Sequence, residues 1–185
     1  MRGFLLTAGF LLIAVLSQSQ PCAGIPGFLS SRGFEPGKSA FSTSERRMMG
    51  LVLLSLNTES GKTLKNDIYA HPSWDDQGYL SAITRDRKGN IYVAPKPNVN
   101  MLHTRRENLN TVFRVDAENE KMKSFLELPG AIHMSNENPY GILGLQYDCY
   151  TDHLLLSTVN GSTQLEENGK VYAMDPYTKE LLPLV

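Results

Sequence analysis

The sequence predicts an all-β protein built from a repeated unit of short antiparallel strands. The stretch 138–161, NPYGILGLQYDCYTDHLLLSTVNG, contains an apolar strand, a polar turn led by aspartate and an apolar return strand. The same order occurs upstream at 82–93. Turns led by Asn57, Asp116 and Asp175 follow further apolar strands, and each is 59 residues from the next. A fixed period of this length, with several strands in each unit, indicates a repeat architecture.

The individual strands follow from apolar runs bounded by turn residues. Asn160-Gly161 is a strong signal for a tight turn, and Pro95-Lys96-Pro97 ends a strand because proline cannot donate into a ladder. The expected strands cover 51–56, 64–69, 79–84, 89–94, 111–115, 122–128, 141–147, 153–159 and 170–174. The apolar end of the chain, 181–185, matches the strand at 122–128 in the earlier copy.

Such a repeat is typical of a β-propeller or another repeat array. A blade usually has about 40 to 50 residues, so the loops at 95–110 and 130–138 are expected to be long. Residues 45–185 hold about two and a half blades, and a closed propeller has about four to eight. We therefore expect the N-terminal part of a longer propeller, or a protein that completes itself by association.

The N-terminus has the layout of a secretory signal peptide over residues 1–19. Arg2 precedes the apolar core Phe4–Leu16, and small residues follow at Ser17 and Ser19. The core has 13 residues, fewer than the roughly 20 of a membrane span, so we expect no permanent span. The chain is predicted to be secreted or periplasmic.

Residues 20–44 are rich in Gly, Pro and Ser without periodic apolar spacing, which predicts a flexible lead-in. Phe28, Phe34 and Phe41 leave open that this segment packs against the domain. Cys22 and Cys149 either pair in an oxidising compartment or remain free or partner-linked. The net charge of −1 excludes a nucleic-acid binder that depends on bulk positive charge.

At NPYGILGLQYD and DRKGNIYVA the sequence resembles the six-bladed propellers of the SMP-30/gluconolactonase and NHL-repeat group. The resemblance covers about 51–185 and implies a central channel, which often holds a divalent metal in the lactonases. The family pattern has Asn directly before the glycine that opens the inner strand. Here Tyr140 takes that position, and Asn138 lies two residues earlier.

Two groups of residues are candidates for ligand or metal binding. Asp75 and Asp76 offer hard oxygen ligands for calcium or another divalent metal, although a solvated turn beside Gly78 is the simpler explanation of them. The second group precedes an inner strand, where the opening of a propeller would lie, and has carboxylate and amide oxygens with a potential base. Its members are His133, Asn136, Glu137, Asn138 and Tyr140, with Asn138 also a metal candidate.

Two functions follow as hypotheses. The first is a secreted propeller-type protein that binds a small molecule or a protein through its loops. The alternative is a metal-dependent hydrolase of sugar lactones whose remaining ligands lie outside this chain. The sequence contains no nucleophile elbow and no phosphate-binding loop.

Overall fold

The computed structural model describes residues 22–44, 49–55, 68–96, 108–128, 141–163 and 165–184, and the backbone of 58–59 and 62–63. Within these residues the chain is mostly β, as predicted, with three antiparallel sheets and a separate two-stranded hairpin. One short α-helix and two 3-10 helices accompany them. None of the helices in these ranges has the length and apolar character needed to cross a membrane.

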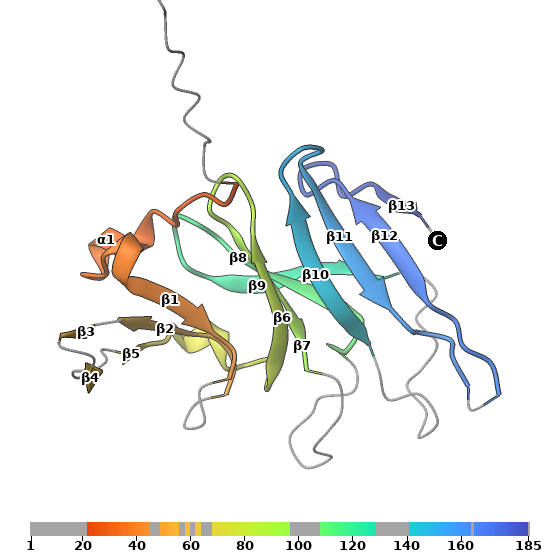
Figure 1. The fold of residues 1–185 in the computed structure, drawn as a ribbon, viewed down its shortest axis with the longest axis horizontal. Helices are drawn as coiled ribbons and strands as arrows, with labels where there is room; N and C mark the ends of the chain where they lie inside the picture. The colour runs from red at the N-terminus through yellow and green to blue at the C-terminus, as the bar shows by residue number, and fades with distance from the viewer. Residues whose placement is uncertain are drawn as a thin grey trace, which may run out of the picture.

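Two of the sheets are four-stranded meanders, in which each strand pairs with the next one along the chain (Figure 1). The first contains β6 (Leu80–Arg85), β7 (Ile91–Pro95), β8 (Thr111–Val115) and β9 (Met122–Glu127). The second contains β10 (Ile142–Asp148), β11 (His153–Thr158), β12 (Lys170–Met174) and β13 (Leu181–Pro183). The strands expected at 111–115 and 170–174 have the predicted bounds, and the others differ by a few residues at their ends.

The corresponding turns of the two meanders have the same hydrogen bonds. Asp116 Oδ1 accepts the backbone N–H groups two and three residues later, both at 3.0 Å. Asp175 Oδ1 does the same at 2.7 and 3.1 Å. Both turns then need a left-handed residue, which is Glu120 with φ 56° and Lys179 with φ 64°. The repeat predicted from the sequence is therefore confirmed for these two sheets.

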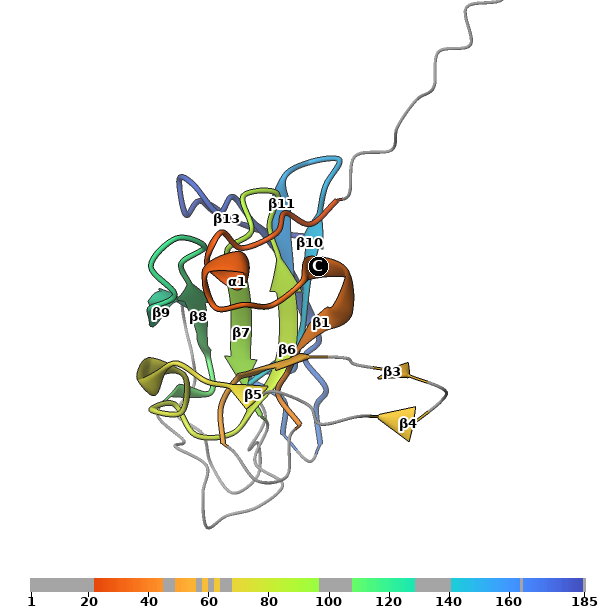
Figure 2. The same cartoon turned by 90° about the vertical axis from the view of Figure 1, so that its left-hand side faces the viewer.

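The third sheet comes first in the chain and has three strands, β1 (Ser39–Ser42), β2 (Val52–Ser55) and β5 (Ile68–Tyr69), in that order. The strand expected at 64–69 is thus described only for its last two residues. The turn expected at 57–61 lies partly outside the described residues. Its described part belongs to the separate hairpin, in which β3 (Thr58–Glu59) pairs with β4 (Lys62–Thr63), and this hairpin projects away from the sheets in Figure 2.

Residues 22–44 are not the flexible lead-in that the composition suggested. They contain α1 (Phe28–Ser31), the 3-10 helix η1 (Pro36–Lys38) and β1, and α1 and β1 lie in front of β6 and β7 in Figure 2. Phe28 is 3% exposed and Phe34 8% exposed. Their rings reach Trp74 and Tyr69, with centroids 5.9 and 6.4 Å apart. Non-periodic phenylalanines thus bind the segment to the domain.

Two clusters of buried apolar side chains fill the spaces between the three sheets, and β7 contributes residues to both clusters. Ile91 and Val93 face the cluster beside α1 and the first sheet, whereas Tyr92 and Ala94 face the cluster between the two meanders. Because successive strand residues point to opposite faces, β7 is buried on both sides. The middle sheet is therefore packed between its neighbours, and this stacking is the main source of apolar burial.

Candidate functional site

The predicted metal ligands Asp75 and Asp76 lie in an exposed turn. They follow the 3-10 helix η2 (Pro72–Trp74), and the carbonyl of Asp75 accepts the N–H of Gly78 at 3.0 Å. Both carboxylate residues are exposed. In the described part of the chain, no group of three or more His, Cys, Asp or Glu side chains gathers as it would around a metal. Within the described residues, Asp75 and Asp76 therefore have no third histidine, cysteine or carboxylate side chain beside them that could complete a metal site.

The other predicted ligand residues lie outside the described residues, which break off between Leu128 and Gly141. These are His133, Asn136, Glu137, Asn138 and Tyr140. The residues on either side are held in place, because Leu128 N–H donates to the carbonyl of Asn110 and Ile142 N–H donates to that of Leu109. The two donor–acceptor distances are 3.0 and 3.1 Å. The role assigned to the segment stays a prediction.

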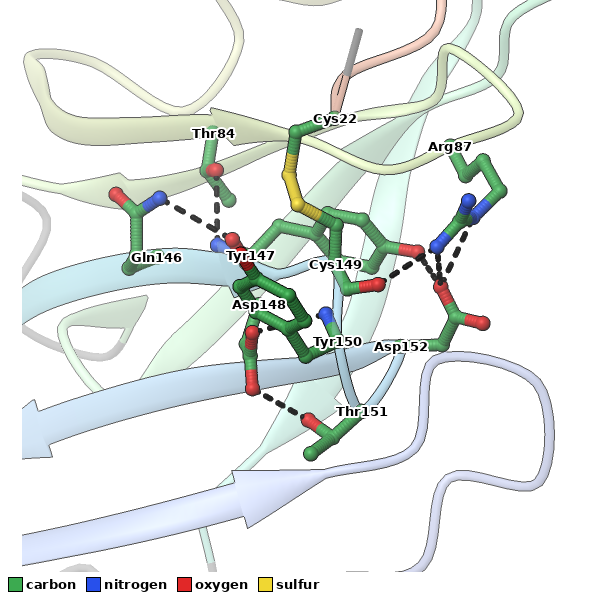
Figure 3. Close-up of a disulfide and its surroundings, with 10 residues drawn as sticks. All are labelled: Cys22, Thr84, Arg87, Gln146, Tyr147, Asp148, Cys149, Tyr150, Thr151 and Asp152. Carbon is green, nitrogen blue, oxygen red and sulfur yellow. Dashed lines mark hydrogen bonds and ion pairs between the residues drawn. A yellow bond between two sulfur atoms is a disulfide. The ribbon is translucent and has the colours of Figure 1, made fainter. Parts of the chain in front are cut away.

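The disulfide between Cys22 and Cys149 resolves the question that the sequence left open. It joins residues 127 positions apart, with Cα atoms 5.4 Å from each other (Figure 3). Arg87 braces the same turn by donating to the carbonyl of Cys149 at 2.6 Å and to Asp152 Oδ1 at 3.1 Å. The hydroxyl of Tyr147 donates to the same Asp152 oxygen at 2.5 Å. The disulfide thus anchors the N-terminal segment to the β10–β11 turn.

These contacts shift the acid–base properties of the turn. Burial, together with the hydrogen bond to Asp152, raises the pKa of Tyr147 to about 12. The hydrogen bonds from Tyr147 and Arg87 hold the pKa of the Asp152 carboxyl below its ordinary value. Asp152 is therefore a charged acceptor for two donors at neutral pH, which suits a structural brace rather than a proton-transfer group.

The chain just after Cys22 lies directly on the β6–β7 turn. Gly24 N–H donates to the carbonyl of Asp86 at 2.8 Å. A Cβ atom on Gly24 would lie 2.3 Å from the carbonyl oxygen of Arg87, so only glycine fits this approach. The carboxylate of Asp86 is fully buried and accepts from Asn90 and from the hydroxyl of Tyr92 at 3.0 Å. This carboxylate is satisfied by its own turn and strand.

Glu120 is a further structural carboxylate, and no sequence pattern predicted its role. Its oxygens accept from Arg32 Nε at 3.0 and 3.1 Å and from the hydroxyl of Tyr69 at 2.7 Å. Its backbone carbonyl accepts from the indole of Trp74 at 2.8 Å. Hydrogen bonds from Arg32 hold the pKa of Glu120 below its ordinary value. The residue links the α1 segment, the first sheet and the middle sheet.

A groove between α1, β1 and β6 is large enough for a small organic molecule. Its volume is about 270 Å³. Leu29, Phe41 and Ile83 give it an apolar lining, and Arg85 adds a cation. Sequence patterns missed this groove because its walls come from segments that are far apart in the chain.

Comparison with family models, with curated proteins and with solved structures finds no match to this chain. The resemblance to the SMP-30/gluconolactonase and NHL-repeat group thus stays a prediction, carried by the strand–turn motifs alone.

Proposed function

We propose that this chain is a secreted protein of β-propeller type that binds a small molecule or a protein through its loops, without catalysis of its own. The observation that carries the proposal is the face-to-face stacking of two consecutive four-stranded meanders. Propellers are built from four-stranded sheets of this kind arranged around a central channel. The three-stranded sheet packs on the other face of the middle meander, as a preceding blade would.

The contact between the two meanders supports this arrangement. Their first strands, β6 and β10, lie side by side in Figure 1, and the backbone N–H of Tyr147 donates to the hydroxyl of Thr84 at 3.0 Å. In a propeller the inner strands of successive blades meet in this way around the axis. The proposed ligand residues His133, Asn136, Glu137 and Asn138 come shortly before β10, so they would lie near the central opening.

Two features support export. The signal-peptide layout of residues 1–19 directs a chain to the secretory route. The Cys22–Cys149 disulfide is of the kind that persists in oxidising compartments. Both point to a protein that works in a periplasmic or extracellular space.

A calcium titration with a coupled activity assay tests the proposal. The melting temperature of the purified chain is measured at increasing calcium or magnesium concentrations. A separate folded sample, saturated with the metal ion, is incubated with simple sugar lactones. We expect a saturating rise of the melting temperature with calcium and no lactone hydrolysis above the background rate. Calcium ligands are carboxylate and amide oxygens, so Asn136→Ala with Asn138→Ala should abolish the rise. Asp75→Asn with Asp76→Asn serves as the control and should retain it.

Each other outcome has a definite meaning. If the chain hydrolyses lactones and the Asn136→Ala and Asn138→Ala variant does not, the protein is a hydrolase and the proposal of binding without catalysis is wrong. A calcium response that is lost only with Asp75→Asn and Asp76→Asn would move the metal site to the η2 turn. A melting temperature that no divalent cation changes would contradict the assignment of Asn136 and Asn138 as calcium ligands of the proposed binding site.

A further inference from the structure

A basic groove lies between the outer parts of the two meanders. Its volume is about 170 Å³, and four cationic side chains line it together with Asp116, Asn119, Ser124 and Phe125. The cations are Arg114, Lys121, Lys123 and Lys179. Lys179 comes from the β12–β13 turn and the other three from the β8–β9 hairpin, so the groove forms only where the two sheets pack together.

The cations are arranged in a way that folding alone disfavours. Arg114 and Lys123 are directly opposite each other in the β8–β9 register, where like charges destabilise a sheet. Arg114 Cζ and Lys179 Nζ lie 5.2 and 4.9 Å from the centroid of the same Phe125 ring. Cation–π attraction to that ring is available to both cations, but it leaves the like charges of Arg114 and Lys123 uncompensated.

The groove contains little negative charge to balance these cations. Its one carboxylate, Asp116, lies 4.0 Å from Arg114. One oxygen of Asp116 already accepts the N–H groups of Glu118 and Asn119. Within the described part of the chain, Lys121, Lys123 and Lys179 form no ion pair. A bound anion would relieve this repulsion.

We propose that this basic groove binds a tetrahedral oxyanion, the phosphate or sulfate group of a small molecule. Arg114 can donate two parallel hydrogen bonds to such a group, and the lysine ammonium groups add charge-assisted bonds. The groove, about 170 Å³ in volume, has room for one such group beside Phe125. The oxyanion is either a free ion or the charged end of a small ester, and the two share this recognition chemistry.

Thermal melting and calorimetric titration with inorganic phosphate, inorganic sulfate and phenyl phosphate test the proposal. Sodium chloride at matched ionic strength is the reference. We expect a saturating rise of the melting temperature with phosphate or sulfate. Lys179→Gln and Lys123→Gln should each weaken the affinity about tenfold, the effect of losing roughly one charge-assisted bond. Lys96→Gln removes a charge from an exposed lysine outside the groove and should leave the affinity unchanged.

A second readout separates a binding site from a general salt effect. Lys123→Gln removes the like-charge pair with Arg114, so the ion-free variant should melt at a higher temperature than the wild type at low ionic strength. Tighter binding of phenyl phosphate than of inorganic phosphate would identify a small ester as the occupant, and equal binding would identify the free ion. A rise that does not saturate and is the same in all variants is general salt stabilisation and would overturn the proposal.

Discussion

Glu120 shows how much one residue can contribute when its backbone and side chain act together. Its left-handed conformation closes the β8–β9 turn, and its carboxylate receives donors from Arg32 and Tyr69. Its backbone carbonyl accepts a hydrogen bond from the indole N–H of Trp74, whose side chain has no exposed surface. The side chain of Glu120 is only 12% exposed, so these donors have little access to water as an alternative partner.

Replacing Glu120 by glutamine should therefore lower the free energy of unfolding by about 1 to 2 kcal/mol at pH 7. The hydrogen bonds from Arg32 lower the pKa of Glu120 in the folded state. A lowered pKa contributes stability that is complete above the unfolded-state value of about 4.3 and is lost as the pH falls through the folded-state value. Urea unfolding from pH 7 to pH 3 should thus show the two proteins converging in stability at acid pH.

Glu118→Gln is the matched control, because Glu118 lies in the same turn but is exposed. It should change the unfolding free energy by less than about 0.5 kcal/mol. A Glu120→Gln variant as stable as this control at pH 7 would contradict the structural role of the carboxylate.

The elements differ in how far the sequence could predict them. The strands at 111–115 and 170–174 have the predicted bounds because a short, mostly apolar run and an aspartate-led turn define each hairpin locally. The N-terminal segment was wrongly expected to be flexible, since its order comes from partners far along the chain. Phe28 packs on Trp74, and Cys22 bonds to a residue 127 positions away.

The candidate site was predictable only in part, for the same reason. The turn beside Gly78 that holds Asp75 and Asp76 is predictable from the sequence, but the sequence cannot say whether a turn carboxylate meets other ligands, so their metal-binding role stays a prediction. The walls of the basic groove come from the two meanders, and the walls of the other groove come from α1, β1 and β6. No local pattern reports such a juxtaposition, because packing between distant segments creates it.

The disulfide should make the largest single contribution at the scale of elements. In the chain-entropy model, closing a loop of 127 residues stabilises a protein by about 4 to 5 kcal/mol. The variant with Cys22→Ser and Cys149→Ser should lose about that amount in urea unfolding. A reducing agent should lower the midpoint of the wild type and leave the variant unchanged. An equal response of both proteins to the reducing agent would show that Cys22 and Cys149 are not bonded.

At the scale of the whole molecule, the two meanders are buried unequally. The middle sheet has apolar neighbours on both faces, as the two sides of β7 show. The last sheet packs on the middle sheet with one face, and large apolar side chains stay exposed on it. Leu143 is 43% exposed, Leu182 46% and Leu184 55%. Among the described strands, β13 is an edge of this sheet, and exposed apolar groups on an edge strand favour association with another sheet.

We therefore expect the chain to associate through its last sheet, with Leu182 at the contact. Leu182 pairs with Ala173, which pairs with Leu155 on the next strand, so one apolar row crosses the sheet. Sedimentation velocity over a range of concentrations should show association of the wild type that Leu182→Lys weakens. Leu165→Lys is the matched control, because Leu165 is 99% exposed and lies outside the strands. If both variants associate as the wild type does, the contact lies elsewhere on the molecule. If the wild type stays monomeric throughout, the apolar row that ends at the exposed Leu182 does not drive association.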